Sequence, residues 1–255
     1  MKLNIRQKKV VEATENKILC LASAAAGKTR TLTERIRYLI EVRKVDPTGI
    51  VAITFTNMAA EEMKKRLGAI GDKCFIGTIH SYSNKICITN GIDTLSYLER
   101  FEFDEVLKKA ISLPRFKYPE VEHLLVDECQ DLSPLEYSFL NKIPTKNIFY
   151  VGDNRQMIYT FRGSTDEYLR NMYLDDNYKK YYLVENYRNA PNIIKYADSF
   201  LYSFDKLSPQ SIPIKTKEGI IEECSLSEAI EELKLSKNWG SWFVLTRTNN
   251  ELAEV

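Results

Sequence analysis

The order of the apolar segments is the feature that most constrains the fold of this chain. Short apolar runs that suit buried strands alternate with longer stretches in which apolar residues recur at helical spacing. This alternation predicts an α/β fold, in which a mostly parallel sheet is flanked by helices. We expect strands at residues 17–22, 50–54, 74–76, 121–127, 147–152, 181–185, 219–224 and 242–246. We expect helices at residues 29–42, 57–67, 134–141 and 191–202.

Composition narrows the class of protein further. Of the 255 residues, 44% are hydrophobic, which is enough for a sizeable core. The 36 Lys and Arg residues nearly balance the 35 Asp and Glu residues. The sequence therefore lacks the basic tail that would indicate nucleic-acid binding dominated by phosphate contacts. The five cysteines show no paired spacing and mostly lie in apolar runs, which favours buried, reduced thiols. With no leader peptide or membrane-spanning stretch visible, we expect a cytoplasmic protein without membrane contact.

The first expected strand is followed by a loop that suits phosphate binding. Residues 22–29 read Ala-Ser-Ala-Ala-Ala-Gly-Lys-Thr and open a helix, so backbone N–H groups at its N-terminus can meet phosphates. In such a P-loop, Lys28 reaches the β- and γ-phosphates of ATP and Thr29 binds Mg²⁺. Ala25 is strained if its position needs a positive φ. A helix start that reads Gly-Lys-Thr by chance is the alternative. The loop residues expected to hold the nucleotide are Ser23, Ala24, Ala25, Ala26, Gly27, Lys28 and Thr29.

A pair of acidic residues supports the nucleotide interpretation. Asp127 and Glu128 directly follow the apolar run at residues 121–126, at its carboxyl end. In P-loop enzymes the Asp at this place holds Mg²⁺ and the Glu activates the attacking water. Paired acids at a strand end can also be simply solvated. The P-loop earlier in the chain, together with Gln130 and Asp131 just afterwards, favours the catalytic interpretation.

Seven further segments follow one another in a recognisable order, at residues 3–7, 53–63, 77–81, 127–131, 151–163, 185–188 and 245–249. Together with the P-loop they resemble the motifs of the UvrD/PcrA/Rep-like superfamily 1 DNA helicases, with Cys129 where an aromatic residue is usual. The resemblance implies a RecA-like P-loop NTPase domain that hydrolyses ATP with Mg²⁺. It also implies movement along single-stranded DNA with 3′→5′ polarity.

The resemblance assigns roles around the nucleotide. It implies that Gln7 reads the adenine, while Tyr187 and Arg30 stack on either side of it. Gln156 and Arg188 would contact the γ-phosphate. Taken without the motifs, Tyr187 fits a core aromatic residue and Arg30 fits an exposed helical charge. The resulting set of expected catalytic residues is Lys28, Asp127, Glu128, Gln156 and Arg188.

The resemblance also implies a single-strand binding path. Aromatic faces stack on any base, so they need no sequence code; those implied here are Phe55, Tyr159 and Phe161. Hydroxyl, amide and imidazole groups suit backbone phosphates; those implied are Thr56, Asn57, Thr78, His80 and Ser81. For His80, a satisfied polar side chain near a helix start is the alternative.

Two breaks in the alternation, together with the resemblance, predict the domain organisation. Residues 1–89 and 120–204 form motor domain 1, and residues 90–119, closed by Pro114 and Pro119, form a reduced helical insertion. Residues 205–255 form a linker and the incomplete start of motor domain 2. Because the later motifs are absent and residues 249–255 end inside an expected helix, we expect a piece of a longer protein.

Two functions remain open at this point. The first is an ATP-dependent single-stranded DNA translocase or helicase, of which this chain is the ATP-binding motor portion. The second is a nucleotide-binding regulatory subunit of a nuclease-containing repair or anti-phage complex, without processive unwinding. The glycine-poor P-loop and the short insertion favour the second. The full catalytic set favours the first, because a simple switch does not need all of its members. A decayed gene fragment is a third alternative.

Replacing Phe161 by Ala tests the predicted single-strand path. We expect the affinity for single-stranded DNA to fall by roughly 1–3 kcal/mol, because one stacking platform is lost. The affinity for ATP should stay the same. Fluorescence anisotropy with a labelled oligonucleotide measures the first quantity and titration with ATP the second. An unchanged DNA affinity contradicts the placement of Phe161 in the path.

Overall fold

A computed structural model describes residues 2–156, 167–201, 209–236 and 242–246. The chain divides into two compact units, Met1–Glu218 and Gly219–Val255, which we describe separately. No helix within the described ranges is long and apolar enough to cross a membrane.

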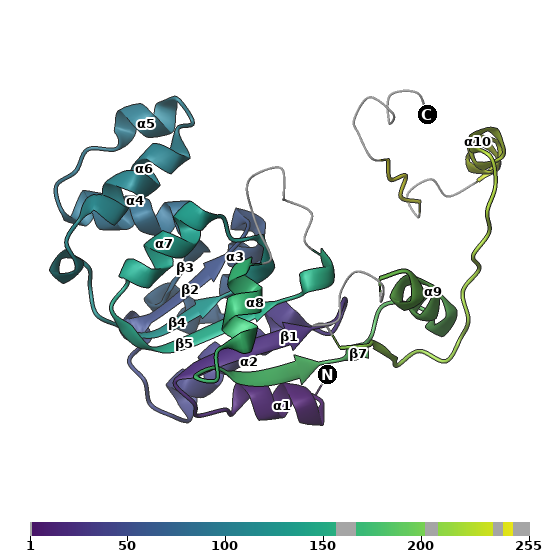
Figure 1. Cartoon of the computed structure of the whole chain (residues 1–255), viewed down its shortest axis with the longest axis horizontal. Coiled ribbons are helices and arrows are strands. Elements are labelled where there is room, and N and C mark those ends of the chain that lie inside the picture. The colour runs from purple at the N-terminus through teal and green to yellow at the C-terminus, as the bar shows by residue number, and fades with distance from the viewer. Residues whose placement is uncertain (1, 157–166, 202–208, 237–241, 247–255) are drawn as a thin grey trace. The chain divides into compact units, whose positions relative to one another are not determined.

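The first unit is built on a six-stranded, entirely parallel sheet with the strand order β3-β2-β4-β5-β1-β6 (Figure 1). Its strands are β1 Lys17–Ala22, β2 Ile50–Thr54, β3 Phe75–Thr78, β4 Val121–Val126, β5 Thr145–Gly152 and β6 Lys179–Leu183. The helices between them make every connection a crossover, as parallel pairing requires. The predicted α/β, RecA-like fold is therefore confirmed.

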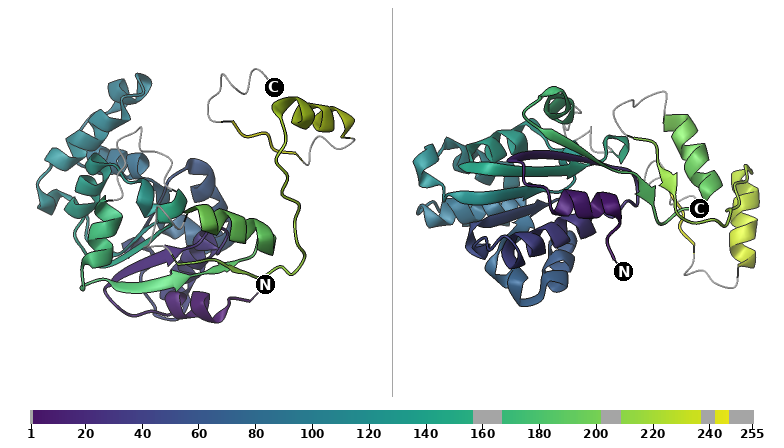
Figure 2. Two further views of the ribbon diagram at one scale, coloured as in Figure 1. Left: turned by 45° about the vertical axis from the view of Figure 1, so that its right-hand side comes forward. Right: turned by 90° about the horizontal axis from the view of Figure 1, so that it is seen from below.

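Helices cover both faces of this sheet (Figure 2). One face is covered by α1 Ile5–Val11, α2 Lys28–Glu41 and α3 Asn57–Leu67. The other is covered by α4 Ile79–Thr89, α6 Phe103–Ser112, α7 Pro134–Lys142 and α8 Glu167–Leu174. Successive strand residues point to opposite faces. Leu19 and Leu21 of β1 accordingly pack on the face covered by α4, α6, α7 and α8, while Ile18 and Cys20 pack on the face covered by α1, α2 and α3.

The segment predicted as an insertion, residues 90–119, contains α5 Leu95–Glu99 and α6. Val106, Leu107 and Ala110 of α6 are fully buried in the same core as α4 and α7. This segment therefore contributes to the core of the first unit. Its interpretation as a reduced accessory domain stays a prediction.

The sequence prediction was wrong in the second unit. Residues 219–224 and 242–246 form no strand, and the described part of this unit has one helix, α10 Leu226–Leu235. A strand needs a neighbour to satisfy its backbone N–H and C=O groups, and the described residues of this unit provide none. The first unit instead holds an unexpected short parallel pair, β7 Glu185–Asn186 with β8 Ile212–Pro213. Helix α9, Pro191–Leu201, lies between them in sequence.

A buried arginine fixes α1 against α2. Arg35 of α2 is only 3% exposed. Its Nη1 donates hydrogen bonds to carbonyl oxygens at the end of α1, at 2.9, 3.1 and 3.0 Å, those of Val10, Val11 and Ala13. A cation at a helix C-terminus is favourable because the carbonyl groups there carry partial negative charge. Since α1 carries Gln7 and α2 begins at Lys28, this contact holds two expected nucleotide-binding elements together.

His123 on β4 makes one contribution to the pH dependence of stability. Its side chain is 15% exposed. Burial, reinforced by the positive charges of Arg35 and Arg43, lowers the pKa of the His123 imidazole to about 4. Between pH 6.5 and 4 the unfolded chain therefore binds a proton at His123 that the folded chain does not. The contribution of neutral His123 is complete above pH 6.5 and is lost as the pH falls toward 4.

We expect this loss to reach roughly 2–3 kcal/mol in the free energy of unfolding. The His123→Gln variant, which cannot titrate, should lose less stability than the unmodified protein between pH 7 and 4.5. Urea unfolding at several pH values measures the difference between the two proteins. The comparison cancels the titration of all other groups. Parallel stability curves would contradict the assignment to His123.

Candidate functional site

The loop between β1 and α2 has the backbone form that a P-loop needs. Gly27, the residue before α2, has φ 82°, and Ala25 has φ 57°. Ala25 is therefore strained in the way that the sequence suggested. Gly27 is required twice, because its φ is positive and because a Cβ atom there would lie 2.9 Å from Nε2 of Gln7.

Gln7 lies against the P-loop from α1. Its Nε2 donates to the carbonyl oxygen of Ala26 at 3.0 Å, and its Oε1 accepts from the backbone N–H of Asn4 at 3.0 Å. An amide has two N–H bonds and two acceptor lone pairs, so one donor and one acceptor remain for an adenine. The side chain of Asn4 also accepts from the N–H of Gln7 and donates to Oη of Tyr187 at 2.6 Å.

Asn4 is a residue to which the sequence reasoning gave no role. The spacing Asn4-x-x-Gln7 is that of a capping box, a pattern that could have identified it. Through this box Asn4 fixes the start of α1. Through its amide it holds Tyr187, which is the residue expected to stack on the adenine.

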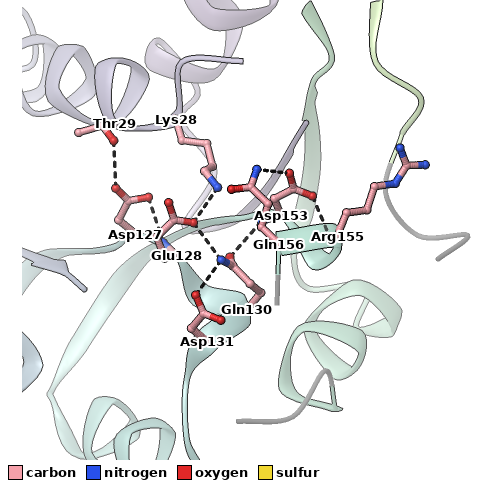
Figure 3. A network of polar contacts seen from close by, with 9 residues as sticks. All are labelled: Lys28, Thr29, Asp127, Glu128, Gln130, Asp131, Asp153, Arg155 and Gln156. Carbon is pink, nitrogen blue, oxygen red and sulfur yellow. Dashed lines mark hydrogen bonds and ion pairs between the residues drawn. The ribbon is translucent and has the colours of Figure 1, made fainter. Parts of the chain in front are cut away.

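The two carboxylates at the end of β4 meet the two residues that begin α2 (Figure 3). Nζ of Lys28 lies 2.6 Å from Oε2 of Glu128. Oγ1 of Thr29 donates to Oδ2 of Asp127 at 3.4 Å. Glu128 has φ 49°, a left-handed conformation that is rare outside glycine and is typical of functional sites. The P-loop and the acidic pair therefore form one site, as the parallel strand order requires.

The electrostatics of this site suit a divalent cation. Asp127 is 6% exposed, and burial together with the adjacent Glu128 raises the pKa of its carboxyl to about 7. For Lys28, burial lowers the pKa of the ammonium, but Glu128 outweighs it, and the pKa lies above its usual value. Burial makes the ionised form of a carboxyl costly, and a neighbouring Mg²⁺ stabilises that ionised form. Thr29 and Asp127 are the residues that would hold it, and Mg²⁺ needs few protein ligands when phosphates supply the rest.

Gln130 connects the end of β4 to the end of β5. Its Nε2 donates to Oε2 of Glu128 at 2.9 Å and to Oδ2 of Asp131 at 3.0 Å, while its Oε1 accepts from the N–H of Asp153 at 3.0 Å. Asp153 in turn accepts, through Oδ2, from Nε2 of Gln156 at 2.6 Å (Figure 3). The sequence gave no role to Gln130 or Asp153. The available signals were that Asp153 directly follows β5 and that Gln130 lies in the motif at residues 127–131.

A cavity of about 520 Å³ brings most of the expected nucleotide-site residues together. Its volume lies in the range usual for small-molecule sites. The expected residues that line it are Gln7, Ala24, Ala25, Ala26, Gly27, Lys28, Thr29, Arg30, Glu128, Gln156, Tyr187 and Arg188. Lys2, Glu62 and Arg66 also line it; Glu62 belongs to the motif at residues 53–63, but the sequence gave none of the three a role.

Two expected residues lie outside the lining of this cavity. Asp127 does not line the cavity itself but accepts a hydrogen bond from Thr29, which does. Ser23 is buried behind the loop, where its N–H donates to the carbonyl oxygen of Leu183 on β6 at 2.8 Å. Ser23 therefore fixes the loop to the sheet in this structure.

The residues expected to bind DNA follow the neighbouring strands β2 and β3. Thr56 and Thr78 cap α3 and α4, because their Oγ1 atoms accept from the N–H groups of Ala59 and Ser81, at 3.1 and 3.2 Å. Each hydroxyl therefore has a structural role, which leaves its own O–H free to donate to another group. Asn57, the first residue of α3, is exposed. Tyr159 and Phe161 lie outside the described residues.

Phe55 and His80 line a second cavity, of about 760 Å³. The His80 ring lies 5.7 Å from that of Phe103, and its Nε2 lies 3.7 Å from Oδ1 of Asp104. The other described acidic residues in the lining are Glu102, Glu105, Asp131 and Glu136. Aromatic faces in an acidic lining suit the uncharged rings of bases better than phosphate groups.

Comparison with known proteins assigns the family. The sequence profile of the family described as the UvrD/REP helicase N-terminal domain matches residues 3–115 and 101–177. The chain therefore belongs to this family, whose P-loop NTPase architecture agrees with the sheet and the site described above.

Individual relatives of low sequence identity agree with this family assignment. The chain is 24% identical to the ATP-dependent DNA helicase PcrA of Staphylococcus epidermidis, in an alignment that covers 97% of this chain and 48% of that protein. The PcrA of Staphylococcus aureus is also 24% identical, with the same coverage. The chain thus spans about half the length of the curated relatives it matches.

Replacing Gly152 by Ala tests the bridge between β4 and β5. A Cβ atom at Gly152 would lie 2.6 Å from Oε1 of Gln130 and 2.7 Å from Sγ of Cys129. The added methyl group must displace Gln130 from Asp153, so we expect ATP turnover to fall by at least about 10-fold. ADP binding should remain, because the P-loop is untouched.

Gly49→Ala is the matched control, since its added Cβ would crowd only Glu122, at 3.2 Å from the Glu122 Cβ atom. Steady-state turnover and ADP titration of both variants check the prediction. Equal turnover in the two variants would show that the close approach at Gly152 has no role in the site.

Proposed function

We propose that this chain is the ATP-binding motor portion of an ATP-dependent single-stranded DNA translocase or helicase. The observation that carries the proposal is the cavity of about 520 Å³, because one space is lined by residues of the P-loop, the end of β4, the segment after β5 and the segment after β6. The five expected catalytic residues are Lys28, Asp127, Glu128, Gln156 and Arg188. Four of them line this cavity, and Asp127 contacts it through Thr29.

The ion pair between Lys28 and Glu128 suggests how nucleotide binding prepares hydrolysis. With Nζ of Lys28 at 2.6 Å, Oε2 of Glu128 is bound to the ammonium group and is not available to a water molecule. Phosphates that enter the P-loop attract Lys28 toward themselves. Glu128 is then left with Gln130, whose Nε2 donates to it at 2.9 Å, and is positioned to accept a proton from the attacking water.

The remaining groups stabilise the charge of the transferred phosphoryl group. Thr29 and Asp127 would hold Mg²⁺, which neutralises negative charge on the phosphate oxygens when bound. Gln156 would turn its amide from Asp153 toward the γ-phosphate, and Arg188, exposed at the cavity, would supply a positive charge. Gln7 and Tyr187 would select the adenine.

A small cavity supports coupling between this site and a DNA strand. Its volume is about 90 Å³. Phe55, Thr78 and His80 line it together with Asp127 and Glu128. Residues expected to contact the strand therefore share a space with the catalytic carboxylates. We propose single-stranded DNA as the partner, with 3′→5′ movement of the whole protein as the family resemblance implies.

The regulatory-subunit alternative draws support from the glycine-poor P-loop, where Ala25 has φ 57°, but from no other contact of the described residues. Neither a nuclease partner nor a repair or anti-phage context has an observation behind it. The catalytic interpretation is therefore the one to test first.

ATP hydrolysis tests the proposal, with Lys28→Ala and Glu128→Gln as the diagnostic variants. Lys28→Ala should abolish nucleotide binding, because no other group replaces its contact with the phosphates. Glu128→Gln should bind ATP as tightly as the unmodified chain but lose at least about 100-fold in turnover, since the proton acceptor is gone. Glu120→Gln, an exposed Glu at the other end of β4, is the matched control.

The measurements are ATP titration and phosphate release, each with and without single-stranded DNA. Faster phosphate release in the presence of DNA, lost in Glu128→Gln, supports a DNA-coupled motor. An equal loss of nucleotide binding in both variants would defeat the assignment of roles. ATP binding without turnover under either condition would favour a regulatory role.

A further inference from the structure

A buried ion pair lies directly behind the residue expected to read the γ-phosphate. Gln156 ends a short turn, η5 Asn154–Gln156, which follows β5. Next to it, Arg155 points away from the nucleotide network (Figure 3). Its Nη1 donates to Oδ1 of Asp198 on α9 at 2.7 Å. The two side chains are 6% and 18% exposed, so the pair is largely shielded from solvent.

Asp198 connects three segments that are separate in the sequence. Its Oδ1 accepts from Nη1 of Arg155. Its Oδ2 accepts, at 3.0 Å, from the N–H of Ser211, which directly precedes β8. It lies on α9, which begins three residues after Arg188. One carboxylate therefore joins the turn that carries Gln156 to the helix that follows Arg188.

The other restraint on this turn comes from Asp153. Asp153 accepts from the N–H of Arg155 at 3.1 Å and from Nε2 of Gln156 at 2.6 Å. If the Gln156 amide turns to a phosphate, the second of these bonds is lost. The contact between Arg155 and Asp198 uses neither atom, so it can hold the turn while the amide moves.

We propose that Asp198 is a positioning residue that acts through Arg155 to hold Gln156 and Arg188 in one frame for the γ-phosphate. The inference rests on the proposed ATP-binding function and adds a residue that the motif resemblance does not include. Neither Asp198 nor Arg155 needs to contact the nucleotide. They affect the difference between the affinity for ATP and the affinity for ADP, which depends on the γ-phosphate.

The test compares the affinities for ADP and for a non-hydrolysable ATP analogue in the whole chain, by calorimetry. The unmodified protein should prefer the analogue. In Asp198→Asn and in Arg155→Gln, we expect this preference to fall by about 10-fold, a typical coupling between two groups of one site. ADP affinity should stay unchanged, because the P-loop is not altered. The double variant should be no worse than either single variant, because each change breaks the same contact.

Two controls separate positioning from folding. Arg155→Lys keeps a cation opposite Asp198 and should retain most of the preference. Lys195→Gln removes an exposed charge from the same helix and should change nothing. If Asp198→Asn fails to fold, the comparison of Arg155→Gln with Arg155→Lys still decides the question.

The outcomes distinguish the two proposals. Variants that keep the full preference for the analogue overturn the role of Asp198 and leave the proposed function intact. A double variant with additive losses also overturns it. An unmodified chain that binds neither nucleotide overturns the proposed function, and the inference with it.

Discussion

The ion pair between Lys28 and Glu128 joins the two halves of the nucleotide site. Lys28 begins α2, and Glu128 follows β4, which lies two positions from β1 in the sheet. Only a parallel sheet brings the carboxyl ends of these strands to the same edge. The contacts of Thr29, Gln130 and Asp153 surround this pair and depend on the same arrangement. The strand order is thus the condition for the contacts that join the P-loop to the residues after β4 and β5.

The sequence predicted the first unit well because its signals are local. The apolar runs of β1 and β2 and the helical spacing of α3 gave the observed bounds, since buried parallel strands read as continuous apolar runs. The P-loop residues and the acidic pair at the end of β4 followed from these local patterns, whereas the other site residues came from the family resemblance. Residues 219–224 and 242–246 show the limit of this reasoning, because an apolar run forms a strand only when another strand satisfies its backbone.

The sequence could not predict the contacts that fix the site from behind. Asp198 and Arg155 lie 43 residues apart, and nothing in either neighbourhood signals the other. The bridge through Gln130 depends on the close approach that Gly152 allows, which becomes visible only when β4 and β5 are paired. Motifs identify the groups that meet the ligand. The groups that hold them in place come from tertiary packing and leave weaker traces in the sequence.

The position of α1 has a practical consequence for work with this protein. Lys2 lines the nucleotide cavity, and Asn4 holds Tyr187 beside it. A tag placed ahead of Lys2 would therefore be attached beside a residue that lines the cavity. It would compete with a nucleotide for space and could pull Asn4 away from Tyr187. A cleavable tag, removed before any measurement, avoids a loss of affinity that would otherwise be ascribed to the site itself.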